Sequence, residues 1–322
     1  MVPVDVTESF HEGERALQSR TGARERLAAL GPQLIRDYMP EQHRTFFAQL
    51  PFVIAGSVNR EGQPWASLLC NPPGFMHSPD PRRLSIAALP MAFDPLHHTL
   101  ASGADIALLG IEQHTRRRNR MNGVVAQVNA TGFAVEVKQS FGNCPKYIQA
   151  RQAEYWERTE RVRRYAAATL NPTARRLIES ADTFFIATAH PATNNGAAAT
   201  NVGVDVSHRG GKPGFVKIEQ QQTLVVPDFS GNRFFNTLGN LQLNPRAGLL
   251  FIDFANGDLL YLTTAVETIF DGPAVAAFTG AERLLRFNVL HAIYVTAAVP
   301  LRWFGEVQLS PFLEPMGDWN TA

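Results

Sequence analysis

Hydrogen-bonding side chains and one arginine surround the start of an expected helix at residues 232–243. These candidates are Ser230, Asn232, Arg233, Thr237 and Asn240. Backbone N–H groups at a helix start, together with hydroxyl and guanidinium groups, form a binding site for an anion. The sequence therefore predicts a site that a phosphate group fits.

A basic, glycine-rich turn at residues 207–214 precedes this helix and carries Arg209 and Lys212. Two interpretations are open: the turn brings both cations to the same anion, or it is an ordinary hairpin turn. It is not a Walker loop, because the spacing before Lys212 differs and Pro213 stands where a Ser or Thr would hold magnesium.

The segment at residues 139–148 carries Asn143, Cys144 and Lys146. Asn143 and Pro145 suit the first turn of a helix, so a capping turn is one interpretation. The other is that Asn143, Cys144 or Lys146 faces a ligand from the first half of the chain. Cys144 has no adjacent His or second Cys, and we expect an inert thiol.

Three further groups have weaker signals. His97 and His98 are adjacent, which puts them on different faces of a helix and denies them the spacing of metal ligands, so no metal site is predicted. The basic run at residues 116–120 lacks interleaved aromatic residues, and in a hairpin it points to solvent, a dimer partner or a phosphate. Arg302 and Trp303 end the last expected strand, either as a packed edge or as part of the site.

Helices are expected at both ends of the first strand-rich region. Residues 1–50 read as a helical arm, with Pro32, Pro40 and Pro51 as breaks. At residues 149–180 three glutamates each stand four positions before an arginine, the spacing of helix-surface ion pairs, and a connecting helix is predicted.

Two strand-rich blocks, at residues 51–148 and 181–310, align with each other. Five short matches occur in the same order with an offset that drifts from 132 to 141, beginning with Phe52 opposite Phe184. Each copy reads as hairpin strands, a short strand, one helix at 94–102 or 232–243, and long strands. The predicted fold is mainly β with helices (α+β), with two tandem β-barrels and a tail at residues 311–322.

Composition limits the functional classes. The 322 residues are 45% hydrophobic and carry a net charge of +1, so no global field recruits nucleic acid or an anionic membrane. Two cysteines are too few for a disulfide scaffold. The first 14 residues lack the apolar core of a signal peptide, and the longest uncharged stretch, at 183–204, is too polar to cross a bilayer. These features favour a cytoplasmic protein.

Four segments together resemble the pyridoxamine 5'-phosphate oxidase-like flavin-binding proteins. They are residues 207–215 (SHRGGKPGF), 227–233 (PDFSGNR), 244–251 (NPRAGLLF) and 139–148 (QSFGNCPKYI), the last being similar to a signature of the tandem-domain branch. The resemblance spans roughly residues 45–310. It implies split β-barrels that bind flavin mononucleotide (FMN), usually in a homodimer with the flavin near the subunit interface.

The resemblance also implies roles for individual residues. Arg209 and Lys212 would meet the flavin phosphate or ribityl chain from the strand side, and Pro227 and Asp228 would lie along the isoalloxazine ring. The phosphate would be held from the helix side by Ser230, Asn232, Arg233 and Thr237, with Asn240 as a weaker candidate. The second copy has Thr263 and Thr264 where the family commonly has a Gly. A side chain at this position puts in doubt whether a ligand comes close to the backbone there.

Two functions follow from the resemblance. The first is an FMN-dependent oxidoreductase of unassigned substrate, with catalytic residues unknown and electrons from a nicotinamide donor or a separate reductase. The second is a non-catalytic carrier of a flavin nucleotide or haem, since no titratable pair or base–nucleophile arrangement is evident. An interaction module is a third possibility. No pyridoxamine phosphate oxidation is predicted, because fold-level likeness is poor evidence for a substrate.

Overall fold

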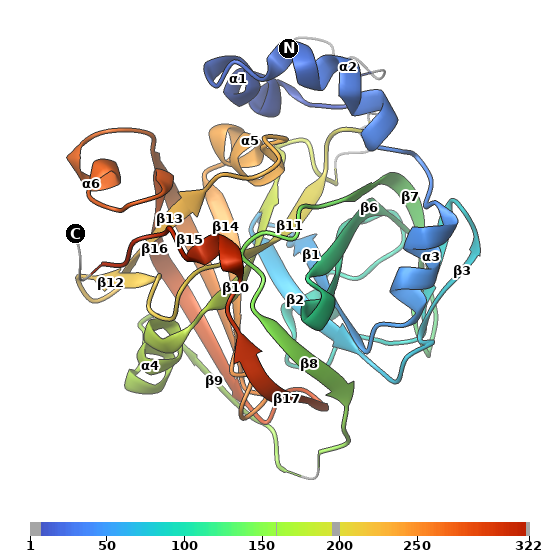
Figure 1. The fold of residues 1–322 in the computed structure, drawn as a ribbon. Helices are drawn as coiled ribbons and strands as arrows, with labels where there is room; N and C mark the ends of the chain where they lie inside the picture. The colour runs from blue at the N-terminus through green and yellow to red at the C-terminus, as the bar shows by residue number, and fades with distance from the viewer. Residues whose placement is uncertain (1–7, 159, 195–199, 320–322) are drawn as a thin grey trace.

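The computed structural model describes residues 8–158, 160–194 and 200–319 (Figure 1). Part of the segment judged not to be a signal peptide, and part of the uncharged stretch at 183–204, lie outside these described residues. The predicted helical arm is present in three helices, α1 (Glu12–Arg20), α2 (Arg24–Leu34) and α3 (Glu41–Ala48). Within the described part, no helix is long and apolar enough to cross a membrane.

The first repeat is a seven-stranded antiparallel sheet in the order β2-β1-β5-β6-β7-β4-β3. Its strands are β1 (Phe52–Val58), β2 (Pro64–Cys70), β3 (Met76–Asp80), β4 (Arg83–Ile86), β5 (Asp105–Glu112), β6 (Arg117–Val128) and β7 (Phe133–Gly142). The expected helix at 94–102 is reduced to a short 3₁₀ turn, η1 (Pro95–His98), and a second one, η2 (Gln113–Thr115), joins β5 to β6.

The second repeat has an equivalent sheet in the order β11-β10-β14-β15-β16-β13-β12. Its strands are β10 (Thr183–Ala189), β11 (Val204–Gly210), β12 (Lys217–Glu219), β13 (Thr223–Phe229), β14 (Arg246–Ile252), β15 (Leu259–Ile269) and β16 (Ala281–Thr296). Its helix is α5 (Asn236–Leu243), and a short helix α6 (Pro273–Ala276) precedes β16. The matching strand orders confirm the predicted repeat, and the fold is the expected mainly β, split-barrel class with few helices.

One predicted match between the repeats is wrong by one residue. Ile54 pairs with Leu109 in the first sheet, and Phe185 pairs with Leu250 in the second, so Val53 corresponds to Phe184. The amino-acid sequences of β1 and β10 are similar in either register. A one-residue slip reverses which face of a strand is buried, and only the observed register puts Val53 and Phe184 in equivalent cores.

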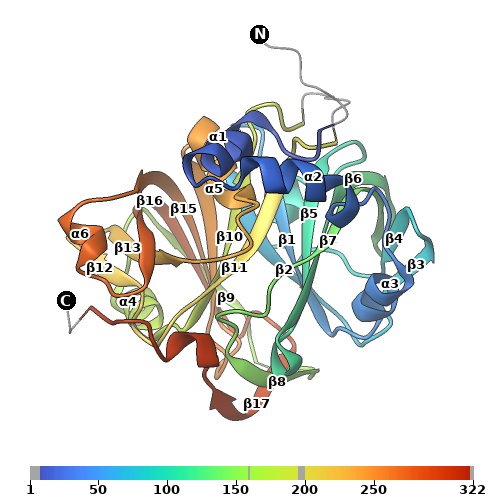
Figure 2. The ribbon, with the colours of Figure 1, turned by 45° about the horizontal axis from the view of Figure 1, so that its top comes forward.

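The two repeats pack on each other through the strands that open each sheet (Figure 2). In β1, Val53 and Ala55 lie in the core of the first barrel, whereas Phe52 and Ile54 lie in an apolar cluster between the barrels. Phe185 of β10 joins the same cluster. Because both faces of these strands are buried, their sequences are continuous apolar runs without polar alternation.

The predicted connecting helix exists only in part. Residues 150–155 form strand β8 (Ala150–Tyr155) and residues 163–167 form β9 (Arg163–Ala167), while the helix is confined to α4 (Pro172–Ser180). Glu154 pairs across strands with Arg302 of β17 (Leu301–Gln308) instead of with Arg158 four residues on. Charge spacing alone, without an apolar stripe to bury, did not stabilise a helix there. The chain ends in a 3₁₀ turn, η3 (Pro311–Leu313), within the predicted tail.

Candidate functional site

A pocket lies where the two repeats meet, lined from the first by β6 and the segment after β7 and from the second by β11, β13, β16 and the start of α5. Five arginines line it: Arg118, Arg120, Arg209, Arg233 and Arg283. The lining acids are Asp228 and Glu282, and Asp205 pairs with Arg120 from behind the lining, so five arginines meet three carboxylates and the formal charge is +2. Such an excess of guanidinium groups favours an anionic ligand.

Arg118 is the arginine without an acidic partner. Its Nε donates to the carbonyl oxygen of Cys144 at 2.9 Å, and its Nη1 lies 3.4 Å from Nδ1 of His208. Among the described residues it forms no ion pair with a carboxylate. Burial lowers the pKa of the Arg118 guanidinium, although an arginine remains charged at neutral pH. The pocket thus contains a positive charge that its own residues do not neutralise.

Two carboxylates hold other arginines in place. Asp228 accepts from Nη1 of Arg209 at 2.5 Å and from Nη1 of Arg283 at 3.0 Å. Asp205 accepts from Nη1 of Arg120 at 2.5 Å, and Nη2 of Arg120 donates to Ser207. Both carboxylates, Arg120 and Arg283 are buried and Arg209 is partly buried, so these ion pairs hold the guanidinium groups in place before any ligand arrives.

Two buried donors belong to arginines that line the pocket. Nε of Arg120 and Nε of Arg209 make no hydrogen bond with the described residues. Buried N–H groups in proteins are normally paired, so these two atoms are unsatisfied donors next to the pocket. The phosphate of FMN offers acceptor oxygens and a negative charge, and the residues present fit that group.

The start of α5 adds backbone donors. Arg233 and Phe235, just before the helix, have φ angles of 63° and 65°, a left-handed conformation that is uncommon for residues other than glycine. Phe235 occupies the N-cap position and its side chain makes no capping bond. The first N–H groups of α5 are therefore left to another acceptor beside Thr237.

The enclosed volume sets a limit on what fits without rearrangement. It is about 110 Å³, room for a phosphate-sized group, whereas pockets for whole small-molecule ligands measure roughly 300–1,000 Å³. A flavin ring would have to lie across the mouth of the pocket.

His208 also lines the pocket and is buried. Burial, followed by the charges of Arg118, Arg151 and Arg209, holds the pKa of its imidazole well below the ordinary value. The ring is therefore neutral at physiological pH, and it adds no charge to the pocket.

The structure brings together seven of the residues singled out in the sequence. They are Arg209, Asp228, Asn232, Arg233, Thr237, Asn143 and Cys144, and all line the pocket. Asn143 and Cys144 come from the first repeat, and the element after them is strand β8, so the interpretation of this segment as a turn that caps a helix is wrong. Their roles toward a cofactor stay predictions.

Lys212 does not share the pocket with Arg209. Its ammonium group donates to the carbonyl oxygen of Met316 in the C-terminal tail. Arg209 belongs to β11, whereas Lys212 follows the end of that strand and points elsewhere. The two cations expected at one anion are thus separated, because Lys212 lies in the turn after β11 and its ammonium group is bonded to the C-terminal tail.

Six more of the singled-out residues have partners outside the pocket lining. Three belong to the second repeat: Pro227 pairs with Leu284 within the sheet, the carbonyl of Ser230 accepts from the Tyr147 hydroxyl, and Nδ2 of Asn240 donates to Thr188.

The other three lie elsewhere in the chain. Nζ of Lys146 lies 5.3 Å from the Phe312 ring centre. Arg302 pairs with Glu154, and Nε1 of Trp303 donates to Gln113.

Sequence reasoning missed Arg118 and Arg120 as site residues. We expected the run at 116–120 in a hairpin pointing to solvent, a dimer partner or a phosphate. The run does lie in a hairpin, the one that joins β5 to β6. Within it Arg118 and Arg120 line the pocket, whereas Arg117 lies 5.0 Å from the Phe46 ring centre. The two-residue strand period could have separated them. No motif marked Glu282 or Arg283.

The position that corresponds to the pocket when the roles of the two repeats are exchanged is filled by side chains. Tyr261 stands where the pocket has Arg120, since these residues pair with Leu250 and Leu109 respectively. Its hydroxyl donates to Asp94 at 2.8 Å, and Ser67, the counterpart of Ser207, donates to the same carboxylate at 2.5 Å. Burial raises the pKa of Asp94 to about 6. The two repeats have therefore diverged into one cationic pocket and one filled core.

Thr264 occupies the position that corresponds to Gly123, and both sit at a register shift of their strands. A Cβ on Gly123 would lie 2.0 Å from the carbonyl oxygen of Glu136, so that glycine is needed for close strand approach. In the first repeat the glycine thus serves the packing of β6 against β7.

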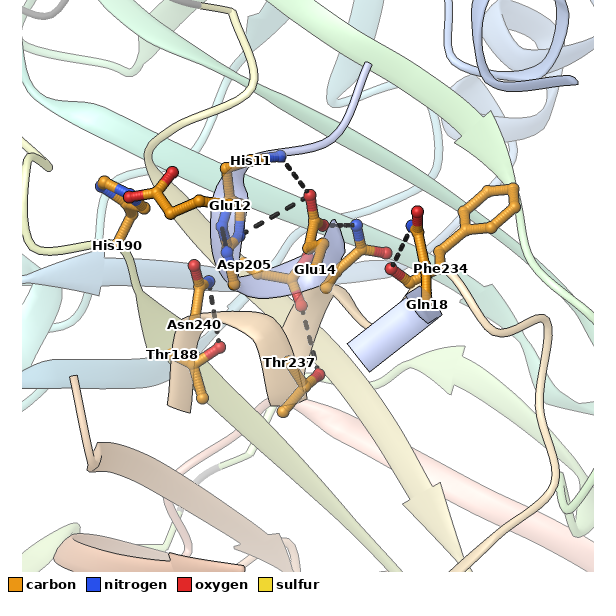
Figure 3. Close-up of polar contacts among 12 residues, drawn as sticks. His11, Glu12, Glu14, Gln18, Thr188, His190, Asp205, Phe234, Thr237 and Asn240 are labelled. Atoms are coloured by element: carbon orange, nitrogen blue, oxygen red, sulfur yellow. Dashed lines mark hydrogen bonds and ion pairs between the residues drawn. The ribbon is translucent and has the colours of Figure 1, made fainter. Parts of the chain in front are cut away.

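His11, Glu12 and His190 place potential ligand atoms within 4.8 Å of one another (Figure 3). Nδ1 of His11 accepts from the Gly13 amide at 3.2 Å, and Nδ1 of His190 accepts from the Ala192 amide at 3.0 Å. In a neutral imidazole the proton is then on Nε2, the nitrogen that would have to bind a metal. The cluster is two imidazole rings in edge-to-face contact, each accepting a backbone hydrogen bond, and it does not fit a metal.

The fold and the pocket define a tandem split-barrel protein with a cationic pocket between its repeats. The family model described as pyridoxamine 5'-phosphate oxidase matches residues 39–164. The match covers the first repeat, and it is to the same family that the sequence resembles.

Three of the solved structures similar to the chain each cover about one repeat. A putative pyridoxamine 5'-phosphate oxidase from Lactobacillus delbrueckii is 11% identical over 39% of this chain and 94% of its own, with a TM-score of 0.31. A protein related to general stress protein 26, from Clostridium acetobutylicum, is 14% identical over 41% and 91%, with a TM-score of 0.29. The haem storage protein HutZ from Vibrio cholerae is 13% identical over 40% and 95%, with a TM-score of 0.27. Comparison with curated proteins gave no match.

Proposed function

We propose that the pocket between the repeats binds the phosphate of FMN and that the protein is a flavin-dependent oxidoreductase of a small molecule. The observation that carries the proposal is the excess of positive charge at the pocket, where five arginines meet Asp228, Glu282 and Asp205 and where Arg118 has no acidic partner. A phosphate monoester with a charge of about −2 complements this lining.

The chain's own groups would bind and orient the cofactor. Arg118 and Arg209 supply charge-assisted hydrogen bonds to the phosphate, while Asp228 keeps Arg209 in a fixed position. Thr237 and the first N–H groups of α5 complete the cradle from the helix side. FMN supplies hydride and electron transfer when bound, and the protein positions it and tunes its surroundings.

Both repeats of one chain contribute to this pocket. The first supplies Arg118 and Arg120 and the second supplies Arg209 and Thr237. The contact between repeats thereby provides what a subunit interface provides in the resembling dimers. A homodimer stays a prediction, and one FMN per chain is expected because the counterpart place is filled by Tyr261 and Asp94.

Two neighbouring arginines of β6, one in the pocket and one outside it, give a test of the site. Arg118→Gln removes the unpaired pocket charge, and we expect FMN affinity, measured by quenching of flavin fluorescence, to fall about 10- to 100-fold. Arg117→Gln is the matched control, because its side chain is exposed and points to Phe46. Equal affinities for both variants and the wild type would refute the assignment.

Catalysis needs a separate experiment. The FMN-loaded protein is mixed with NADH or NADPH without oxygen, and the flavin absorbance is followed before and after air is admitted. Bleaching and recovery support an oxidoreductase. Bound flavin that no donor or reductase reduces supports the carrier function instead.

Haem is the second candidate ligand. The supporting observation is the buried, neutral His208, whose Nε2 has no hydrogen-bond partner among the described residues. A neutral imidazole nitrogen is a common haem ligand. A Soret band that appears on addition of haem and is lost in His208→Ala, with no FMN binding, would favour this function.

A further inference from the structure

Helix α1 of the N-terminal arm packs directly on α5, which carries part of the pocket (Figures 1 and 2). The contact is between glycine backbones. A Cβ on Gly13 would lie 2.2 Å from the carbonyl oxygen of Gly239, and a Cβ on Gly239 would lie 2.6 Å from Cγ of Glu14. No larger residue fits at either position without moving the helices apart.

A buried carboxyl group links α1 to the pocket. Glu14 accepts from Nδ2 of Asn236 at 2.5 Å through one oxygen and from the His11 amide at 2.9 Å through the other (Figure 3). Oδ1 of the same Asn236 accepts from Nη1 of Arg120 at 3.1 Å. A continuous series of hydrogen bonds therefore runs from α1 through α5 to a guanidinium group of the pocket.

A second set of contacts runs from α1 to the loop before α5. The carbonyl oxygen of Thr21, at the C-cap of α1, accepts from Nη1 of Arg233 at 3.3 Å. Nε2 of the fully buried Gln18 donates to the carbonyl oxygen of Phe234 at 3.3 Å. The Phe10 and Phe234 rings meet edge to face at 5.4 Å. The arm thus holds the loop whose residues Arg233 and Phe235 have left-handed backbones.

The charges around Glu14 explain how it makes this contact without cancelling the pocket charge. Burial raises the pKa of the Glu14 carboxyl to about 8, and Asp205 adds to this, while Arg120 and the hydrogen bonds from His11 and Asn236 oppose it. Burial lowers the pKa of the neighbouring His11 to about 3. At neutral pH both groups are uncharged, and Arg120 keeps Asp205 as its acidic partner.

We propose that α1 is a part of the binding site: its docking on α5 positions Arg120 and Arg233, and docking of α1 and occupation of the pocket stabilise each other. The positioning does not depend on which anion binds, whereas the coupling to FMN rests on the proposed function. By linkage, FMN must then protect α1 as strongly as docked α1 favours FMN.

The test compares Gly13→Val with Ala16→Val, which adds the same kind of bulk on the exposed side of α1. Hydrogen exchange is measured for α1 and for residues 232–238, together with FMN affinity. We expect Gly13→Val to speed exchange in both segments and to weaken FMN binding about tenfold. Ala16→Val behaves as wild type, and FMN slows exchange of α1 in the wild type.

Faster exchange in α1 of Gly13→Val, with unchanged exchange at residues 232–238, would overturn the positioning role. A wild type that binds no FMN would remove the proposed function, while the exchange at residues 232–238 would still decide the positioning role.

A milder pair of variants covers the case in which Gly13→Val fails to fold. Glu14→Ala removes the acceptor for Asn236, and we expect FMN to bind about tenfold more weakly. Glu14→Gln, which keeps an acceptor oxygen, restores most of the affinity. Equal FMN affinity in wild type and Glu14→Ala would contradict the proposal.

Discussion

The Glu14→Gln substitution probes the most strongly perturbed carboxyl group beside the pocket. The Glu14 carboxyl has a pKa of about 8 in the folded protein against an ordinary 4.5. Between these two pH values the folded chain keeps the proton and the unfolded chain releases it. The contribution of Glu14 to the free energy of unfolding therefore falls as pH rises from about 4.5 to 8, and is constant above 8.

The size of this effect follows from the shift. A difference of about 3.5 pKa units corresponds to about 5 kcal/mol, at 1.36 kcal/mol per unit. A glutamine side chain does not titrate, so the free energy of unfolding of the variant lacks this decrease between pH 4.5 and 8. It also replaces one acceptor oxygen by an NH₂ group, which costs about 1 kcal/mol in a lost hydrogen bond. The variant should be slightly less stable than wild type at pH 4.5 and more stable by several kcal/mol at pH 8.5.

Urea unfolding followed by tryptophan fluorescence at pH 4.5, 6.5 and 8.5 measures this reversal. Glu25→Gln, on the exposed side of α2, is the control and should follow the wild-type curve. The titration of Asp94 is common to all three proteins and cancels in the differences. Stability curves of Glu14→Gln and wild type that stay parallel from pH 4.5 to 8.5 would refute the reasoning that Glu14 is neutral when folded.

Two further substitutions test the asymmetry of the repeats and the limits of the pocket. Tyr261→Phe leaves the buried Asp94 with one donor fewer, and should lower the urea-unfolding free energy by about 1–3 kcal/mol. Because the pKa of Asp94 is about 6 and rises further in this variant, the loss is larger at pH 8 than at pH 5, and an equal loss at both pH values would contradict this account. Lys212→Ala removes a contact to the Met316 carbonyl outside the pocket and should leave FMN affinity within twofold, whereas a tenfold loss would restore Lys212 to the site.

The fold was largely predictable because repeated local patterns carry it. The apolar runs that begin at Phe52 and at Thr183 recur with similar spacing, and both fold into the same strand order. The register was harder: a run buried on both faces shows no alternation, so Phe52 and Val53 were equally good matches for Phe184. The pairing of β8 with β17, over about 150 residues of chain, left no local signal, and a helix was predicted there instead.

The candidate site was predicted in part for the same reason. Residues close together in the sequence, such as Asn232, Arg233 and Thr237, could be recognised around one helix start. The contributions of Arg118 and Arg120 depend on how the two barrels pack, which no local pattern specifies. Glu14 lies 222 residues from Asn236, and its role depends on a glycine contact between α1 and α5 that only the folded chain shows.

The central claim is that one cationic pocket per chain binds FMN. Titration of the purified protein with FMN, followed by flavin fluorescence and by the absorbance of the bound cofactor after removal of the excess, tests it most directly. We expect saturation at one FMN per chain, with affinity weakened about 10- to 100-fold in Arg118→Gln and unchanged in Arg117→Gln. A protein that neither contains nor binds FMN, or that binds two per chain, would contradict the claim.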